Sequence, residues 1–105
     1  MKLFDKNGML NDKYTEILKL DKMLTEAQIP HTLERAMDGW QVVYPDKEKW
    51  VADAIEHRGS YGHEKNLLAI MGLIRPEETC DSVLGWLTAE DVFQRFSEHY
   101  KGEKK

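Results

Sequence analysis

The stretch that decides the fold is HTLERAMDGWQVVY, residues 31–44. Asp38 and Gly39 lie at its centre, and an Asp-Gly pair favours a tight hairpin turn because both residues tolerate positive φ. The run after the pair is rich in β-branched and aromatic residues, as strands are. The sequence therefore predicts two antiparallel strands, at about 31–37 and 40–44.

The next segment, 50–57, fits two patterns. Trp50, Val51 and Ala54 would share one face of a helix, whereas the alternation from Val51 to His57 fits a strand. Because the segment follows a hairpin, we expect a third strand that extends the hairpin into a meander. On such a strand, Asp53 and Glu56 point to opposite faces, and we expect both carboxylates to be solvated.

The three predicted helices cover 12–28, the apolar residues 67–71, and the segment from 88 onward. The first has apolar residues at helical spacing, and Pro30 forces it to stop. The second is apolar on nearly all sides, as a core helix is, and Gly72 can end it. The third begins with a capping-box pattern at 88–91. A helix is therefore expected before, inside and after the strands.

Two shorter elements complete the predicted fold: a ribbon or bare turn around Asn7-Gly8, and a short buried segment or strand at 83–87. The element order implies an α+β fold, with a small antiparallel sheet of about three or four strands packed by three helices. With 105 residues, we assign 1–101 to a single domain and 102–105 to a flexible charged tail. The sheet face without helices is then solvated or covered by a partner.

Composition excludes several classes of protein. The formal net charge is −4 and the basic residues form no stripe before the tail, so nucleic-acid binding is not expected. Cys80 stands alone and cannot form an intrachain disulfide. No apolar run approaches the ~20 residues needed to cross a bilayer. We expect a cytoplasmic protein without a membrane partner.

The densest polar cluster, EHRGSYGHE at 56–64, is the candidate ligand-binding site. Its candidate ligand-binding residues are His57, Arg58, Ser60, Tyr61, Gly62 and His63. The glycines expose backbone amides and a helix is predicted to follow, so the loop could seat a phosphate-bearing or nucleotide-type ligand. The competing interpretation is a tight turn that caps that helix, since the loop matches no phosphate-loop or dinucleotide fingerprint.

Chemistry-bearing residues give no stronger signal. His57 and His63 are separated by five residues, a spacing typical of neither a helical metal pair nor a zinc finger. Cys80 could form a nucleophile pair only with a histidine distant in the sequence, and nothing near it supports that role. We therefore assign no catalytic residue, metal or cofactor. A small hydrolase or nuclease using His57 and His63, with or without a metal, is the alternative hypothesis.

Aromatic residues suggest a partner interface. Trp40 and Tyr44 lie at even spacing on one strand face, and with Trp86 they form the candidate interface unless they fill the core. A homodimer is plausible on this basis. A structural protein that oligomerises through these rings is a further alternative.

Five strings carry a resemblance across nearly the whole chain: MKLFDKNG (1–8), GWQVVYP (39–45), IEHRGSYG (55–62), LLAIMGL (67–73) and DSVLGWLTAEDVF (81–93). Together they resemble a group of small uncharacterised proteins encoded by phages and prophages of Gram-positive bacteria. The resemblance implies a phage accessory protein in the cytoplasm of the bacterial host. Such proteins often counteract host immunity by sequestering a nucleotide-type signal, which suits the loop at 58–63, or by occluding a defence protein, which suits the aromatic residues.

Overall fold

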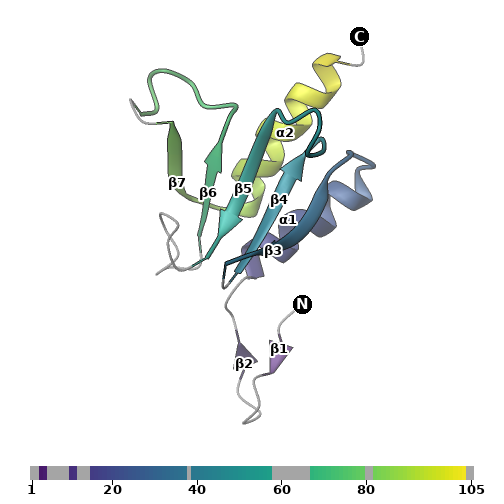
Figure 1. Cartoon of the computed structure of the whole chain (residues 1–105), viewed down its shortest axis with the longest axis vertical. Coiled ribbons are helices and arrows are strands. Elements are labelled where there is room, and N and C mark those ends of the chain that lie inside the picture. Colours follow the sequence, from purple (N-terminus) through teal and green to yellow (C-terminus); the bar gives the residue numbers. More distant parts are fainter. Residues whose placement is uncertain are drawn as a thin grey trace.

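The computed structural model describes residues 3–4, 10–11, 15–37, 39–57, 67–79 and 82–103. The fold is α+β, as the sequence predicts. Two helices cover one face of a five-stranded antiparallel sheet whose strands are neighbours in chain order (Figure 1). These elements are α1 (Thr15–Glu26), β3 (Thr32–Ala36), β4 (Gly39–Tyr44), β5 (Ala52–Glu56), β6 (Leu68–Met71), β7 (Val83–Leu87) and α2 (Ala89–Glu103).

The two ends of the chain differ in part from expectation. β1 (Leu3–Phe4) and β2 (Leu10–Asn11) pair antiparallel, which agrees with a ribbon at 3–11, while its turn lies outside the described residues. At the other end α2 continues through Gly102 and Glu103. Two residues assigned to the tail are therefore helical.

The prediction of a helix at 67–71 is wrong, because residues 68–71 form β6. Leu68, Ala69 and Ile70 are all fully buried, since β6 lies between β5 and β7. An inner strand buried on both faces shows no polar alternation, so periodicity cannot distinguish it from a core helix. The described residues therefore contain two helices and a sheet of five strands, instead of three helices and three or four strands.

The predicted meander is confirmed. β3 pairs with β4 from Thr32↔Val43 to Ala36↔Gly39, and β4 pairs in turn with β5. Gly39 is required where β4 begins, because a Cβ there would lie 1.9 Å from the carbonyl oxygen of Glu56. Gly39 pairs with Ala36 as the first residue of β4, so what requires a glycine here is the close approach of β5.

α1 ends as the sequence predicts. Gln28 takes a φ of 59° and its N–H donates to the carbonyl of Thr25, while the N–H of Ile29 donates to the carbonyl of Leu24. These are the two bonds of a Schellman motif, and the buried Ile29 supplies its apolar contact. Pro30 follows directly, so the chain leaves the helix towards β3.

α2 begins with the predicted capping box. Thr88 Oγ1 accepts a hydrogen bond from the N–H of Asp91, and the carboxylate of Asp91 accepts one from the N–H of Thr88. A second cap comes from the other helix, because Glu16 Oε1 accepts from the N–H of Ala89 at 2.8 Å. This bond joins the two helices beside the buried side chains that both contribute to the core.

The sheet has two different faces. On the covered face, the row Val42↔Ala54↔Ile70 packs into one core cluster with buried residues of α1 and α2. Successive strand residues alternate, so the open face carries the rows Val43↔Asp53↔Met71 and Gln41↔Ile55↔Ala69. No helix lies over the open face among the described residues (Figure 1).

The edge strand β7 contains a β-bulge. Leu84 pairs with Ile70 and Leu87 with Leu68, so Gly85 and Trp86 together lie opposite one residue of β6. Trp86 takes a φ of 58°, and its side chain is 53% exposed. The bulge therefore turns a large aromatic ring towards solvent at the edge of the sheet.

Candidate functional site

The predicted ligand loop is described only at its first residue. His57 follows β5, and Arg58, Ser60, Tyr61, Gly62 and His63 lie outside the described residues. The first described element after the loop is the strand β6, so the described elements include no helix whose N-terminus could hold an anion beside the loop. Binding of a nucleotide-type ligand by these residues stays a prediction.

Metal-ligating side chains are not clustered in the described part of the chain. No three His, Cys, Asp or Glu residues there are placed to hold a metal ion. Cys80 lies outside the described residues.

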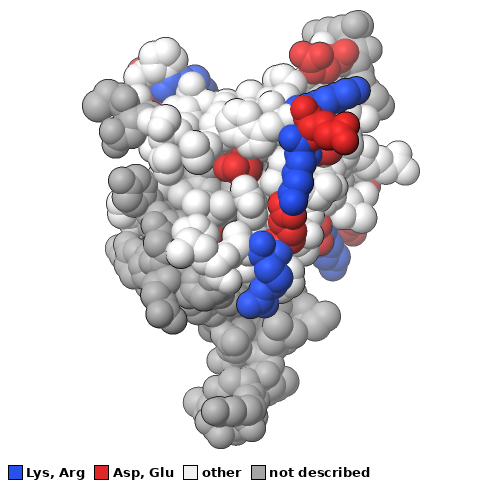
Figure 2. Space-filling model, viewed as in Figure 1, with Lys and Arg blue, Asp and Glu red and all other residues white. Residues whose placement is uncertain are grey.

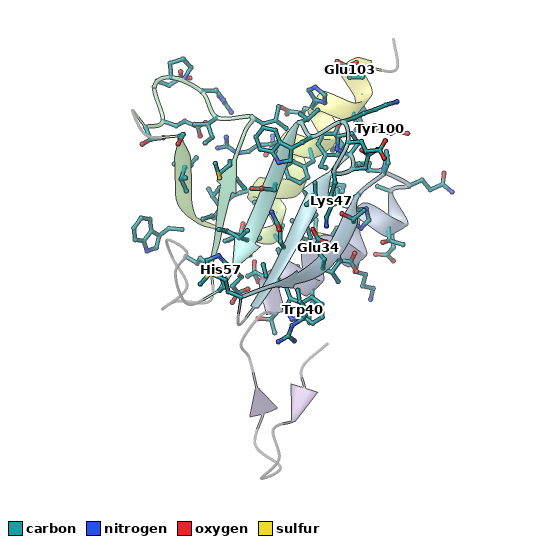
Figure 3. All side chains as sticks on the ribbon, in the orientation of Figure 1. Glu34, Trp40, Lys47, His57, Tyr100 and Glu103 are labelled. Carbon is teal, nitrogen blue, oxygen red and sulfur yellow. The ribbon has the colours of Figure 1, made fainter. Side chains whose placement is uncertain are left out.

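The three aromatic residues of the candidate interface do not form one surface. Tyr44 is 2% exposed and its ring stacks on Phe96 with centroids 5.0 Å apart. Trp40 packs against the core with the Arg35 guanidinium 4.9 Å from its ring centroid, and lies with His57 at one end of the sheet (Figure 3). Trp86 lies on the bulge of β7. Trp40 and Tyr44 do share a strand face, but it is the face that the helices cover.

A different set of residues gathers on the open face, around Asp53 of β5. The Asp53 side chain points away from both helices yet is only 8% exposed. Its Oδ2 accepts hydrogen bonds from Gln41 Nε2 at 2.9 Å and Trp50 Nε1 at 3.3 Å. Its Oδ1 is buried and has no hydrogen-bond partner. The centre of the open face thus contains a carboxylate with half of its acceptor capacity unused.

The prediction that the carboxylates of Asp53 and Glu56 are solvated is wrong. Both are buried, and Glu56 is fully so. They do point to opposite faces, as a strand requires, and Glu56 lies on the covered face. Both carboxylates are buried because β5 is the middle strand of five, which the segment 50–57 alone does not reveal.

Apolar side chains surround Asp53 on the open face. Val43 and Ala69 are buried there although no helix in the described part of the chain lies over them, and Ile55 is half-buried. Trp50 and Met71 are 47% and 37% exposed. Sequence reasoning missed Trp50, Gln41 and Met71 as a group because only the strand register brings them together.

Charge lies to one side of this apolar centre. Figure 2 shows mostly uncharged atoms across the middle of the open face, with one acidic patch among them, and a column of alternating acidic and basic side chains on its β3 side. Lys47 Nζ and Glu34 Oε2 form an ion pair of 2.8 Å there (Figure 3). The open face therefore has an apolar centre with a charged border, the pattern of a recognition surface.

No family model matches the chain, and no curated protein or solved structure is significantly similar to it. Neither helix in the described part of the chain is long and apolar enough to span a membrane. Function must therefore be argued from the geometry. A carboxylate held by an amide and an indole, within exposed apolar surface, suits recognition better than acid–base chemistry.

Proposed function

We propose that this protein is a non-catalytic binding protein that docks on a partner protein through the open face of its sheet. The observation that carries the proposal is the unused Oδ1 of Asp53 beneath the half-exposed Trp50 and Met71. A buried acceptor without a donor costs about 1–3 kcal/mol, and a partner that supplies the donor removes this cost.

The residues around Asp53 are those that interfaces favour. Tryptophan and methionine are enriched in interface centres, and tryptophan is common among the residues that dominate binding energy. The hydrogen bond from Trp50 to Asp53 is long, at 3.3 Å, so a small shift of the ring brings Oδ1 within reach of a partner's N–H donor. Apolar contact and one charge-assisted hydrogen bond would then act together.

The resemblance to phage and prophage proteins supplies the class of partner. We propose a phage accessory protein that acts in the cytoplasm of the bacterial host and occludes a host defence protein. The test is to express the protein in a host that carries a defence system and to measure the plating efficiency of a sensitive phage. Restored plating supports the role, whereas unchanged plating across a panel of defence systems contradicts it.

The docking surface has its own test. Met71→Lys places a charge in the open face, and Gln94→Lys adds the same charge to the exposed side of α2. We expect Met71→Lys to abolish binding of the partner identified by co-purification, and Gln94→Lys to bind it like wild type, measured by calorimetry with purified proteins. Equal binding by both variants overturns the open face as the docking site.

A second copy of the chain could cover the same face. Light scattering at high protein concentration distinguishes this case, because it predicts a wild-type dimer and a monomeric Met71→Lys variant. That pair of results would replace the defence protein with a homodimer, while a monomeric wild type supports docking on a different protein.

A further inference from the structure

A cleft of about 340 Å³ lies at one end of the molecule, apart from the open face. The C-terminal part of α2 forms one wall with His99, Tyr100 and Glu103, and the loop between β4 and β5 forms the opposite wall. Figure 3 shows Tyr100 and Glu103 on α2 at the end of the sheet opposite to His57. A volume at the lower end of the range for ligand sites suits a small molecule.

The side chains of the inner part of the cleft are firmly held. The Tyr44 hydroxyl and His99 Nδ1 lie 2.7 Å apart, and the Tyr44 ring is fixed between Phe96 and His99. Burial, with a smaller contribution from the Glu103 carboxylate, raises the pKa of Tyr44. The phenol therefore stays neutral, and when it donates to Nδ1 the ring proton of His99 lies on Nε2, towards Glu103.

Two opposite charges border the cleft without neutralising each other. Lys49 and Glu103 both line it, and the side chain that contacts the Glu103 carboxylate is His99, with Nε2 at 3.6 Å from Oε1. The Glu103 side chain is 70% exposed and Lys49 is exposed as well. Both charges are therefore accessible to a bound molecule.

The remaining walls are apolar. Pro30 closes the cleft on the side of α1, and Pro45 and Val51 belong to the loop opposite α2. Together with the Tyr100 ring they provide flat, rigid surface, on which a planar apolar group loses little freedom when it binds. The cleft thus combines an apolar slot with one positive and one negative group at its border.

We propose that this cleft binds a small zwitterion with an aromatic body, the chemistry of a free aromatic amino acid. The ring lies between the prolines and Tyr100, the carboxylate faces Lys49, and the ammonium group faces Glu103. Each charge of the ligand meets its opposite, which neither an anionic nor a cationic ligand achieves. The site does not involve the open face and stands whether or not docking there is correct.

The experiment is an NMR titration of the ¹⁵N-labelled protein with L-phenylalanine. We expect shifts to concentrate in the loop 45–51 and in residues 99–103 of α2. N-acetyl-L-phenylalanine lacks the ammonium charge and L-phenylalaninamide lacks the carboxylate, so each should bind about fivefold more weakly than L-phenylalanine, as the loss of one exposed charge contact predicts.

Variants provide the matched control. Lys49→Gln and Glu103→Gln should each weaken the binding of L-phenylalanine by about fivefold. Glu26→Gln, on the exposed side of α1, should leave this binding unchanged. The proposal is overturned if L-phenylalanine causes no shifts up to its solubility limit, if the shifts lie elsewhere, or if the two derivatives bind as tightly as the zwitterion.

Discussion

The covered and open faces of the sheet are built from the same strands yet are buried by different means. On the covered face, Val42 and Ile70 are buried by helices that bring further apolar side chains to them. On the open face, Val43 and Asp53 are buried although no helix of the described residues covers them, and Trp50, which precedes β5, donates a hydrogen bond to Asp53. The covered face is therefore closed to solvent. The open face leaves large apolar side chains partly exposed and one carboxylate oxygen of Asp53 without a hydrogen bond.

Under the proposed function, this difference assigns stability to the covered face and recognition to the open face. Removing a side chain from a closed core leaves a cavity and loses packing on all sides. Changing an exposed residue of the open face loses little in the folded chain but alters the surface that a partner meets. Substitutions on the covered face should therefore lower the stability of the fold, whereas substitutions on the open face should mainly weaken binding of a partner.

The largest effect is expected in the core of the covered face. Phe96 is fully buried and stacks on Tyr44, so Phe96→Ala should lower the free energy of unfolding by about 3–5 kcal/mol. Urea denaturation measures this loss. Because the alanine variant can fall below the stability needed to fold, Phe96→Leu, with an expected loss of about 1–2 kcal/mol, gives a second value. If both Phe96 variants lose less unfolding free energy than these ranges, the core around Phe96 is not closed.

A smaller loss is expected where α2 joins the segment after β6. The Glu78 carboxylate accepts hydrogen bonds from the N–H of Arg75 and, through both oxygens, from the Arg95 guanidinium. Arg95 also donates to the carbonyl of Leu73. Glu78→Gln should therefore cost about 1–2 kcal/mol at neutral pH, measured by urea denaturation. The exposed neighbour Glu77→Gln serves as control and should cost nothing measurable.

The same pair gives a pH dependence of defined sign. The Arg95 hydrogen bond lowers the pKa of Glu78 from 4.5 to about 2, so the folded state favours the ionised carboxylate. Its contribution is present above pH 4.5 and is lost as the pH falls towards 2. The stability difference between wild type and Glu78→Gln should shrink over this range, and a difference that stays constant would contradict the assigned role.

On the open face, Asp53→Asn should leave the stability of the folded protein unchanged or raise it. Asp53→Asn keeps an oxygen for Gln41 and Trp50 and replaces the unused Oδ1 with a neutral group, which is less costly to bury than a charge. We expect the free energy of unfolding to be unchanged or higher by up to about 1 kcal/mol, together with weaker partner binding. A loss of more than about 1 kcal/mol would show that the carboxylate serves the fold.

The smallest effect on stability is expected at Met71. Its side chain is among the exposed apolar residues of the open face, so Met71→Lys should change the free energy of unfolding by less than about 0.5 kcal/mol, as thermal denaturation can measure. The same variant is the one expected to abolish docking. A large loss of stability in Met71→Lys would contradict the difference between the two faces.

Local signals predicted much of the fold. The stop before Pro30 and the capping box at Thr88 act through neighbouring residues, and each lies where the sequence indicated. The hairpin is confirmed too, but its turn is one residue earlier than the Asp-Gly pair predicts, because Gly39 already pairs with Ala36. The helix predicted at 67–71 was wrong because an inner strand, buried on both faces, has no alternation of polar and apolar residues that would indicate a strand. Burial from both sides is set by the neighbouring strands, not by the run itself.

The candidate site was less predictable, because it depends on register. Gln41 and Trp50 meet Asp53 only once β4 and β5 are paired and the loop between them is in place. Even spacing correctly placed Trp40 and Tyr44 on one face, but nothing in 40–44 says which face the helices cover. That choice is made by α1 and α2, which lie at the two ends of the chain.

The bulge at Gly85 and Trp86 also limits how the sheet can grow. A regular edge strand offers a continuous row of backbone groups to another chain, and a bulge interrupts this row. At the opposite edge, β3 carries charged side chains, including Glu34 in its ion pair with Lys47. Both borders therefore disfavour the edge-to-edge pairing of one molecule with the next, the contact from which fibrils grow.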